Sequence, residues 1–284
     1  MKEDTVRLVE RLCIASRGDF GSPYDFAWPD RLPEDAWHFS PELLSIAGTP
    51  IEKSLSPEEG RRLSFFEAVN FFSLNIHGER ALLEGLAARL CRDDLYTPYL
   101  HHFLDEENKH MVYFGTYCLR YAGKIYPDRK MTLPREYAPG EEDFLFFSRV
   151  LLFEEIVDVY NRRMALDQRL DSVAREINRM HHRDEARHLA FGRQIVRELY
   201  ESHSPGWDAE TRAGVRRSLT EYVLATWKEY FNPDVYRDVG IPEPYACARE
   251  AFASDTARAR RVEVSGSALR FLVSAGILAE EPAL

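Results

Sequence analysis

One stretch of the chain, from His181 to His188, carries three side chains that can bind a metal from one face of a helix. Its sequence is His-His-Arg-Asp-Glu-Ala-Arg-His. Positions i, i+4 and i+7 of an α-helix share a face, so His181, Glu185 and His188 project together. His182 points about 100° away from them. The spacing therefore predicts a ligand set of one carboxylate and two imidazoles.

A second pair of this kind occurs earlier in the chain, where Glu107 and His110 lie one helical turn apart. Two Glu-x-x-His helices, together with two further helices that each contribute one inward Glu, form the di-metal site of ferritin-like four-helix bundles. The pattern thus predicts two more glutamates, each on a helix of its own.

The first of these glutamates is expected on the helix that begins at Ser56–Glu59. This run has Ser at the N-cap, Pro at the first position and Glu at the third, which is a helix-start pattern. Glu79 is the one polar position on the apolar stripe that follows, and Glu67 and Glu84 lie off that stripe. A carboxylate in a core-facing seam is unfavourable unless a cation compensates its charge. We therefore predict Glu79 as a metal ligand.

The second single glutamate is expected on the helix that begins near Glu141. One face of this helix is formed by Phe144, Phe147, Leu151, Glu154 and Asp158. Glu154 is the predicted ligand, and Glu155 is the competing candidate because its apolar neighbours make the register ambiguous. The complete predicted ligand set is Glu79, Glu107, His110, Glu154, His181, Glu185 and His188.

The charge of this set matches two divalent metal ions. Four carboxylates supply a charge of about −4, which two Fe(II) ions balance, and neutral imidazoles add none. Mixed oxygen and imidazole ligation suits non-haem iron or manganese, whereas zinc and copper sites favour more His or Cys. Asp105 and Asp184 are candidates to accept the outer imidazole protons and so orient the histidines.

Helical periodicity extends through the rest of the chain, and no strand pattern is convincing, so the predicted class is all-α. Four metal-binding helices are expected within roughly 57–200, in a single domain over 1–284. The flanking segments are an N-terminal wrap over 1–56, with a helix over 1–19 and Trp28 and Trp37 as anchors, and C-terminal helices over 207–284. The latter are expected at 209–231, ending at Asn232-Pro233, and around 245–259 and 268–278.

Composition narrows the functional classes. The net charge of −10 argues against a nucleic-acid-binding surface, and no segment is long and apolar enough for a membrane span. The cysteines, Cys13, Cys91, Cys118 and Cys247, are scattered and are interpreted as reduced packing thiols of a cytoplasmic protein.

The order of the ligands resembles that of the para-aminobenzoate N-oxygenase (AurF-like) family. The matching stretches are Asn75–Glu79, Leu104–His110, Phe153–Asp158 and His181–His188. The additional histidine one turn before the second Glu-x-x-His is the specific part. Ribonucleotide reductase small subunits, acyl-carrier desaturases and hydrocarbon monooxygenases have two histidines in the same frame. The resemblance covers roughly residues 60–260.

The resemblance implies a ferritin-like four-helix bundle with additional terminal helices, in which the seven residues bind two iron ions, with manganese as the alternative. It implies O2 as co-substrate and a small-molecule amine, in secondary metabolism, as the substrate oxygenated toward a hydroxylamine or nitro product. The sequence has no Gly-rich dinucleotide fingerprint and no clustered Cys for an iron–sulfur centre. Electrons are therefore expected from an external reductase or ferredoxin. A homodimer is one assembly that this prediction allows.

Other ferritin-like functions stay open at this point: a C–H hydroxylase or desaturase, a radical-storing ribonucleotide reductase-like subunit, or iron storage. A radical enzyme would need a tyrosine beside one metal, for which Tyr113 and Tyr117 are the candidates. The additional His181 and the long segment after the metal helices favour the N-oxygenase over these alternatives.

Overall fold

The computed structural model describes residues 2–90, 94–129 and 135–284, and the named elements in these ranges are all helical. The α-helices are α1 (Lys2–Asp19), α2 (Pro50–Ser54), α3 (Pro57–Ala87), α4 (Thr97–Tyr117), α5 (Glu141–Leu166), α6 (Ser172–His203), α7 (Ala209–Glu229), α8 (Pro233–Val239), α9 (Pro244–Ala253) and α10 (Asp255–Ser274). Short 3-10 turns are η1 (Pro23–Asp25), η2 (Pro41–Leu43) and η4 (Ser204–Gly206), and α4 continues into a π-helical turn, η3 (Cys118–Ala122).

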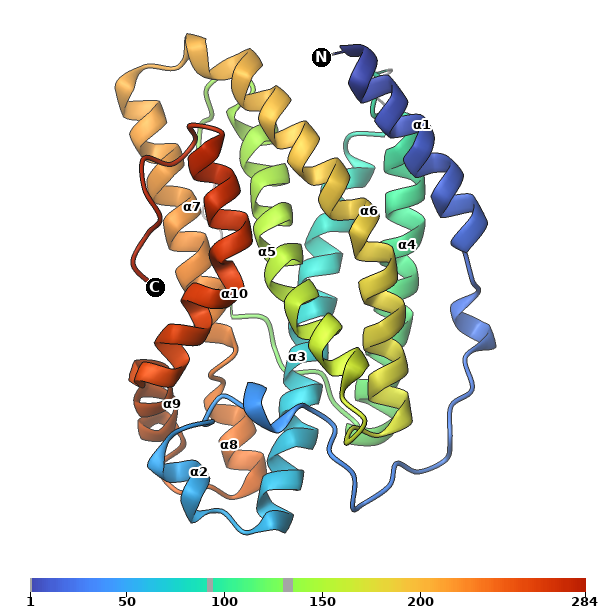
Figure 1. The fold of residues 1–284 in the computed structure, drawn as a ribbon, viewed down its shortest axis with the longest axis vertical. Coiled ribbons are helices and arrows are strands. Elements are labelled where there is room, and N and C mark those ends of the chain that lie inside the picture. Colours follow the sequence, from blue (N-terminus) through green and yellow to red (C-terminus); the bar gives the residue numbers. More distant parts are fainter. Residues whose placement is uncertain (1, 91–93, 130–134) are drawn as a thin grey trace.

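Four long helices, α3 to α6, form the central bundle (Figure 1). Helix α3 packs along α4 and α5 packs along α6, while contacts of α3 with α5 and of α4 with α6 join the two pairs. Helix α1 lies on the outside of α4 and α6, and α7 and α10 cover α5 on the other side (Figure 1). The candidate ligands on α3 to α6 are buried within this bundle.

Side-chain caps define the start of α3, which carries the first candidate ligand, and the start of α6, which carries the last three. The Ser56 hydroxyl accepts the Glu59 amide, and the Glu59 carboxylate accepts the Ser56 amide, which is the expected capping box. At α6 the Asp171 carboxylate accepts the amides of Val173 and Ala174. These caps fix where α3 and α6 begin and hence which face each turn presents to the core.

The N-terminal segment follows the expected course. Trp28 and Trp37 are partly buried against the core, and Trp37 forms an isolated parallel bridge with Leu170. The segment is less irregular than expected, because it contains the short turns η1 and η2 and helix α2. Cys13, Cys118 and Cys247 are buried free thiols, as predicted, whereas Cys91 lies outside the described residues.

The C-terminal part departs from the sequence prediction in two places. The Asn232 side chain accepts the amide of Asp234, so the residue expected only to end a helix also starts α8. The helices predicted around 245–259 and 268–278 are instead α9 and α10, which divide at Ser254. The Ser254 hydroxyl accepts the Ala257 amide and caps α10, because serine competes for backbone donors at a helix start.

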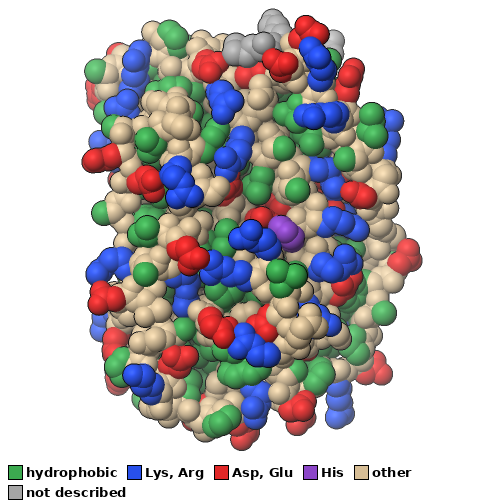
Figure 2. Space-filling model, viewed as in Figure 1, with side chains coloured by type: hydrophobic (Ala, Val, Ile, Leu, Met, Phe, Trp, Pro, Cys, Tyr) green, Lys and Arg blue, Asp and Glu red, His purple; other side chains and the backbone are tan. Residues whose placement is uncertain are grey.

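Acidic and basic side chains are interspersed on the face of the molecule in Figure 2. Among the residues with described structure, no helix combines the length and apolar character required to cross a bilayer.

Candidate metal centre

The structure brings all seven predicted ligands together in the middle of the bundle. Glu79 comes from α3, Glu107 and His110 from α4, Glu154 from α5, and His181, Glu185 and His188 from α6. Each of these side chains is at most 2% exposed. They form three overlapping groups whose ligand atoms lie within 4.8 Å of one another. The groups are Glu79, Glu107, His110 and His181; Glu107, Glu185 and His188; and Glu154, His181 and Glu185.

Many of the inward-facing atoms in this cluster lack hydrogen-bond partners among the residues that the structure describes. They are both carboxylate oxygens of Glu79 and of Glu154, Oε1 of Glu107, Oε2 of Glu185 and Nε2 of His181. Buried polar atoms are normally paired, because leaving them unsatisfied is unfavourable. Converging oxygen and imidazole nitrogen atoms without partners fit divalent metal ions, which would satisfy them together.

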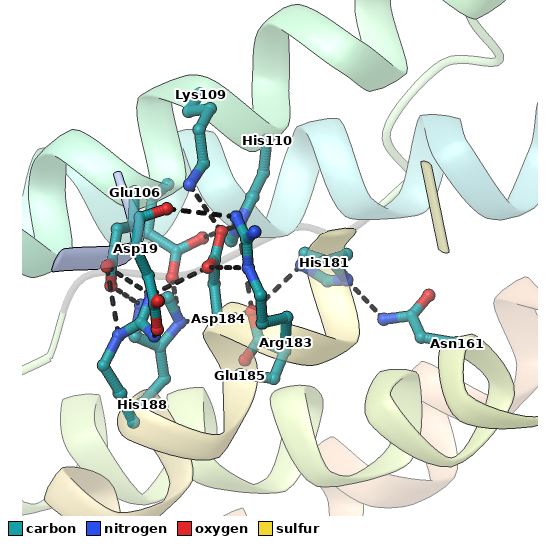
Figure 3. Close-up of polar contacts among 12 residues, drawn as sticks. Asp19, Glu106, Lys109, His110, Asn161, His181, Arg183, Asp184, Glu185 and His188 are labelled. Atoms are coloured by element: carbon teal, nitrogen blue, oxygen red, sulfur yellow. Dashed lines mark hydrogen bonds and ion pairs between the residues drawn. The ribbon is translucent and has the colours of Figure 1, made fainter. Parts of the chain in front are cut away.

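A ring of charged side chains surrounds two of the histidines (Figure 3). His110 Nε2 lies 3.3 Å from Oδ2 of Asp184, and His188 Nε2 lies 2.8 Å from Oε2 of Glu106. A carboxylate only accepts hydrogen bonds, so each can accept the Nε2 proton of a histidine whose Nδ1 binds a metal. The Nδ1 atoms face the cluster, where His110 Nδ1 lies 3.0 Å from Glu107 and His188 Nδ1 lies 3.1 Å from Glu185.

Two buried cations neutralise these outer carboxylates. Lys109 Nζ lies 2.5 Å from Asp184 Oδ2, and Arg187 Nη2 contacts both Asp184 Oδ1 at 2.7 Å and Glu106 Oε1 at 2.5 Å. With two acids and two bases, this ring adds no net charge. The ring therefore supplies no counter-charge for the four glutamates of the cluster, and two divalent ions would supply it.

The third histidine has a different outer partner. His181 presents Nε2 to the cluster, 3.0 Å from Glu185 Oε1 and 3.4 Å from Glu79 Oε1. Its Nδ1 contacts the amide nitrogen of Asn161 on α5, on the side of the ring opposite to Glu185 (Figure 3). Asn161 is seven residues after Glu154 and therefore shares its helix face.

Comparison with known proteins now adds to this geometry. A sequence model of the p-aminobenzoate N-oxygenase family AurF matches residues 2–276. The chain belongs to this family. AurF proteins are oxygenase enzymes with a ferritin-like helical fold, so the predicted family, enzyme class and fold class are confirmed. None of the curated proteins matches the chain significantly.

The electrostatics of the cluster reflect crowding of like charges. Burial, followed by the nearby charges of Glu107 and Glu154, raises the pKa of Glu79 well above its usual range. Burial and the charge of Glu185 do the same to the pKa of Glu154. Burial also opposes ionisation of Glu185, but the charges of His188 and His181 prevail and lower its pKa to about 2. Such opposed shifts between neighbouring carboxylates are typical of functional sites.

The structure also shows which of the competing candidates lie in the cluster. Glu155 is directed away from the cluster and pairs with Arg193, so that Glu154 alone contributes from α5. Asp158, expected on the inward face, instead forms a half-exposed pair with His182 at 2.5 Å. This register is possible because successive turns of a helix drift in angle, and Asp158 is carried to the edge of the inward face.

One expectation about the outer residues needs correction. Asp105 is exposed and orients no histidine; Glu106, the next residue, takes that role. The acidic run around Glu107 signalled an outer carboxylate without showing which side chain faced His188. Glu84 is exposed, as expected, but Glu67 is buried, where it accepts the Ser45 amide at 3.0 Å. Neither belongs to the cluster.

Aromatic rings enclose the histidines of the site. Phe103 stacks on His188 with ring centroids 4.1 Å apart, and Phe114 meets His181 edge-on at 5.0 Å. A cavity of about 750 Å³ opens elsewhere, between α7 and the segments around Asn70 and Pro127, and no cluster residue lines it. Tyr117, one candidate for a radical site, bonds to His38 Nδ1 at 3.2 Å and is not among the cluster residues.

Proposed function

We propose that the protein is a non-haem di-iron oxygenase that oxygenates the nitrogen of a small-molecule amine toward a hydroxylamine or nitro product. The observation that carries the proposal is the third imidazole of the cluster, His181, in a chain of the AurF family. Four carboxylates and three imidazoles offer the mixed ligation that suits iron, with manganese as the alternative.

All seven cluster residues would hold the two ions: Glu79, Glu107, His110, Glu154, His181, Glu185 and His188. Glu107, Glu185 and His181 each belong to two of the three groups, and of these the two carboxylates have a second oxygen that could serve a second ion. When bound, the iron would supply the activation of O2, which amino-acid side chains do not provide. The chain's own contribution is to exclude water by burial and to orient His110 and His188, whose Nε2 protons Asp184 and Glu106 would accept.

The remaining parts of the reaction come from partners. We propose a small-molecule amine as the substrate, O2 as the co-substrate and an external reductase or ferredoxin as the electron donor. A cytoplasmic location accords with the buried free thiols Cys13, Cys118 and Cys247.

Metal analysis followed by an amine assay tests this function. Protein reconstituted anaerobically with Fe(II) should bind two ions per chain and, with O2 and a chemical reductant, should oxidise an aryl amine. His181→Ala should lower that rate by at least about tenfold, which is the lower end of the range for loss of a residue that supports a metal site. His182→Ala is the control, because His182 faces Asp158 and not the cluster. One ion or fewer at saturation, or a parental rate for His181→Ala, would refute the proposal.

A further inference from the structure

The cavity beside α7 has a positively charged lining, although the chain as a whole is acidic. Its volume of about 750 Å³ lies within the range of small-molecule sites. Five Arg or Lys side chains and two Glu side chains line it, which gives the described lining a net charge of +3 in a chain whose net charge is −10. A concave surface of this charge concentrates anions.

The five cations of the lining differ in how the fold compensates their charge. Arg129 pairs with Asp234, and Arg135 pairs with Glu141. Arg149, Arg217 and Lys228 have no carboxylate within ion-pair distance among the residues that the structure describes. Water solvates Arg217 and Lys228, which are exposed, but Arg149 is partly buried. The charge that most needs a partner is therefore that of Arg149.

Arg149 extends from α5 toward α7, where neutral groups hold its guanidinium. Nη2 donates to Oγ of Ser218 at 2.8 Å, and the guanidinium carbon lies 6.0 Å from the centre of the Tyr222 ring. Nε is buried without a hydrogen-bond partner among the described residues. Because a guanidinium presents a planar fork of donors, a carboxylate or phosphate would satisfy both its charge and its geometry.

Helix α7 adds a second arginine at the same end of the cavity. Its lining residues Arg217, Glu221, Ala225 and Lys228 recur at steps of four and three, the spacing of one helix face. Arg217 directly precedes Ser218, which accepts from Arg149, so α5 and α7 each bring an arginine to this end. Lys228 is further along α7 by about 16 Å of helix. Of the two acids, Glu221 follows Arg217 by one turn and is exposed, and Glu229 is next to Lys228.

We propose that this cavity binds a small aromatic phosphate ester, with the phosphate between Arg149 and Arg217 and the ring against Tyr222. A phosphate monoester has a charge of about −1.5 to −2 at pH 7, which two guanidinium groups match, whereas a carboxylate has a single charge. Tyr137 and Phe231 add aromatic surface to the lining. No candidate metal ligand lines the cavity, so the site is separate from the proposed di-iron centre.

Titration calorimetry of the full chain with three probes tests this site. Phenyl phosphate should bind saturably to one site. Inorganic phosphate and benzoate should each bind at least about tenfold more weakly, because the first lacks the ring and the second lacks the additional charge.

Substitutions of Arg149 locate the binding. Arg149→Leu should weaken binding of phenyl phosphate by at least about tenfold, through loss of a charged hydrogen-bond donor. Arg149→Lys keeps the charge without the fork and should fall between this variant and the parent. Arg163→Leu is the matched control, because Arg163 is also a partly buried arginine of α5 but pairs with Glu263 outside the cavity. It should bind as the parent does.

Arg217→Ala keeps the proposal testable if the Arg149 variants do not fold, since Arg217 is exposed. It should weaken binding by about three- to fivefold, as for an exposed charge pair. The proposal is overturned if phenyl phosphate does not bind saturably at millimolar concentrations, or if benzoate binds as tightly. It is also overturned if Arg217→Ala binds as the parent does, or if Arg163→Leu weakens binding as much as Arg149→Leu. None of these measurements depends on iron, O2 or an amine, so the proposed function stands or fails separately.

Discussion

Glu79 and Glu84 are near neighbours on α3 that lie in opposite environments. Glu79 is fully buried, and neither of its carboxylate oxygens has a hydrogen-bond partner among the described residues, whereas Glu84 is exposed to water. The same side chain therefore has different energetics at the two positions. Water solvates the exposed charge of Glu84, whereas the buried charge of Glu79 is stable only if a partner of opposite charge compensates it.

This difference predicts opposite effects of one substitution. Glu79→Gln should abolish binding of at least one of the two metal ions, because an amide does not supply the missing charge. Glu84→Gln should leave metal binding unchanged and alter stability by at most about 0.5 kcal/mol, as is usual at solvent-exposed positions. Metal analysis and denaturant unfolding measure both. Loss of metal in the Glu84 variant alone would mean that the assigned face of α3 is wrong.

Glu67 gives a pH prediction away from the metal centre. Burial raises its pKa to about 7, although the Ser45 hydroxyl and amide bond to its carboxylate. The folded protein therefore binds this proton more tightly than the unfolded chain, so the free energy of unfolding should fall as pH rises from about 4.5 to 7. The loss amounts to about 3 kcal/mol for a shift of this size.

Glu67→Gln should remove that part of the pH dependence, which urea unfolding at pH 5 and pH 8 would measure as a difference from the parent. The same pH dependence in the Glu67 variant as in the parent would contradict a raised pKa. Glu84→Gln serves again as the control and should retain the parental dependence.

At the scale of elements, the close approach of α3 and α5 positions Glu79 opposite Glu154. Gly78 precedes Glu79, and a Cβ at that position would overlap the ring of Phe153, which precedes Glu154. A second glycine of α3, Gly85, meets the Phe146 ring of α5 in the same way. The missing side chains let the two helices approach at the level of the ligands.

Gly78→Ala should therefore separate α3 from α5 or displace Phe153. We expect a loss of stability of about 1–3 kcal/mol, typical of overpacking, together with weaker metal binding. Gly214→Ala on α7 is the matched control, because nothing lies within 4 Å of its added Cβ. It should stabilise the protein by about 0.5–1 kcal/mol through reduced chain entropy. Thermal unfolding that ranks the two variants in the opposite order would contradict this packing.

For the whole molecule, the central cluster couples metal binding to folding. Helices α3 to α6 each contribute ligands, so no single helix retains the site after unfolding. Outer segments are tied to this core as well: Arg260 of α10 donates to the carbonyls of Leu43 and Leu44, far away in sequence. A single domain and a possible homodimer remain predictions.

Metal binding should therefore raise the melting temperature of the entire chain. With free Fe(II) at one hundred times Kd under anaerobic conditions, the free energy of unfolding should increase by about 2.7 kcal/mol per site. A chelator should reverse the increase, and Glu185→Ala, which removes a carboxylate shared by two of the groups, should reduce it. Calorimetric scans that coincide with and without metal would show that the cluster does not bind it.

The sequence alone was sufficient to predict the helices of the bundle and the convergence of the seven candidate ligands. Both follow from local rules. The spacing of His181, Glu185 and His188 fixes their common face, and a lone Glu79 on an apolar stripe must face the core if the stripe does. The caps at Ser56 and Asp171 act within one turn, so they too can be recognised without a fold.

Only the tertiary structure showed which side chains from other helices meet these ligands. The choice of Glu106 over Asp105, the burial of Glu67 beside Ser45 and the contact of Asn161 with His181 each depend on packing between segments distant in sequence. Helical periodicity defines the direction of a side chain from its own axis but not the distance or identity of the neighbour in that direction. Asp184 was expected from the sequence as an outer partner, whereas Glu106 and Asn161 were identified only in the structure.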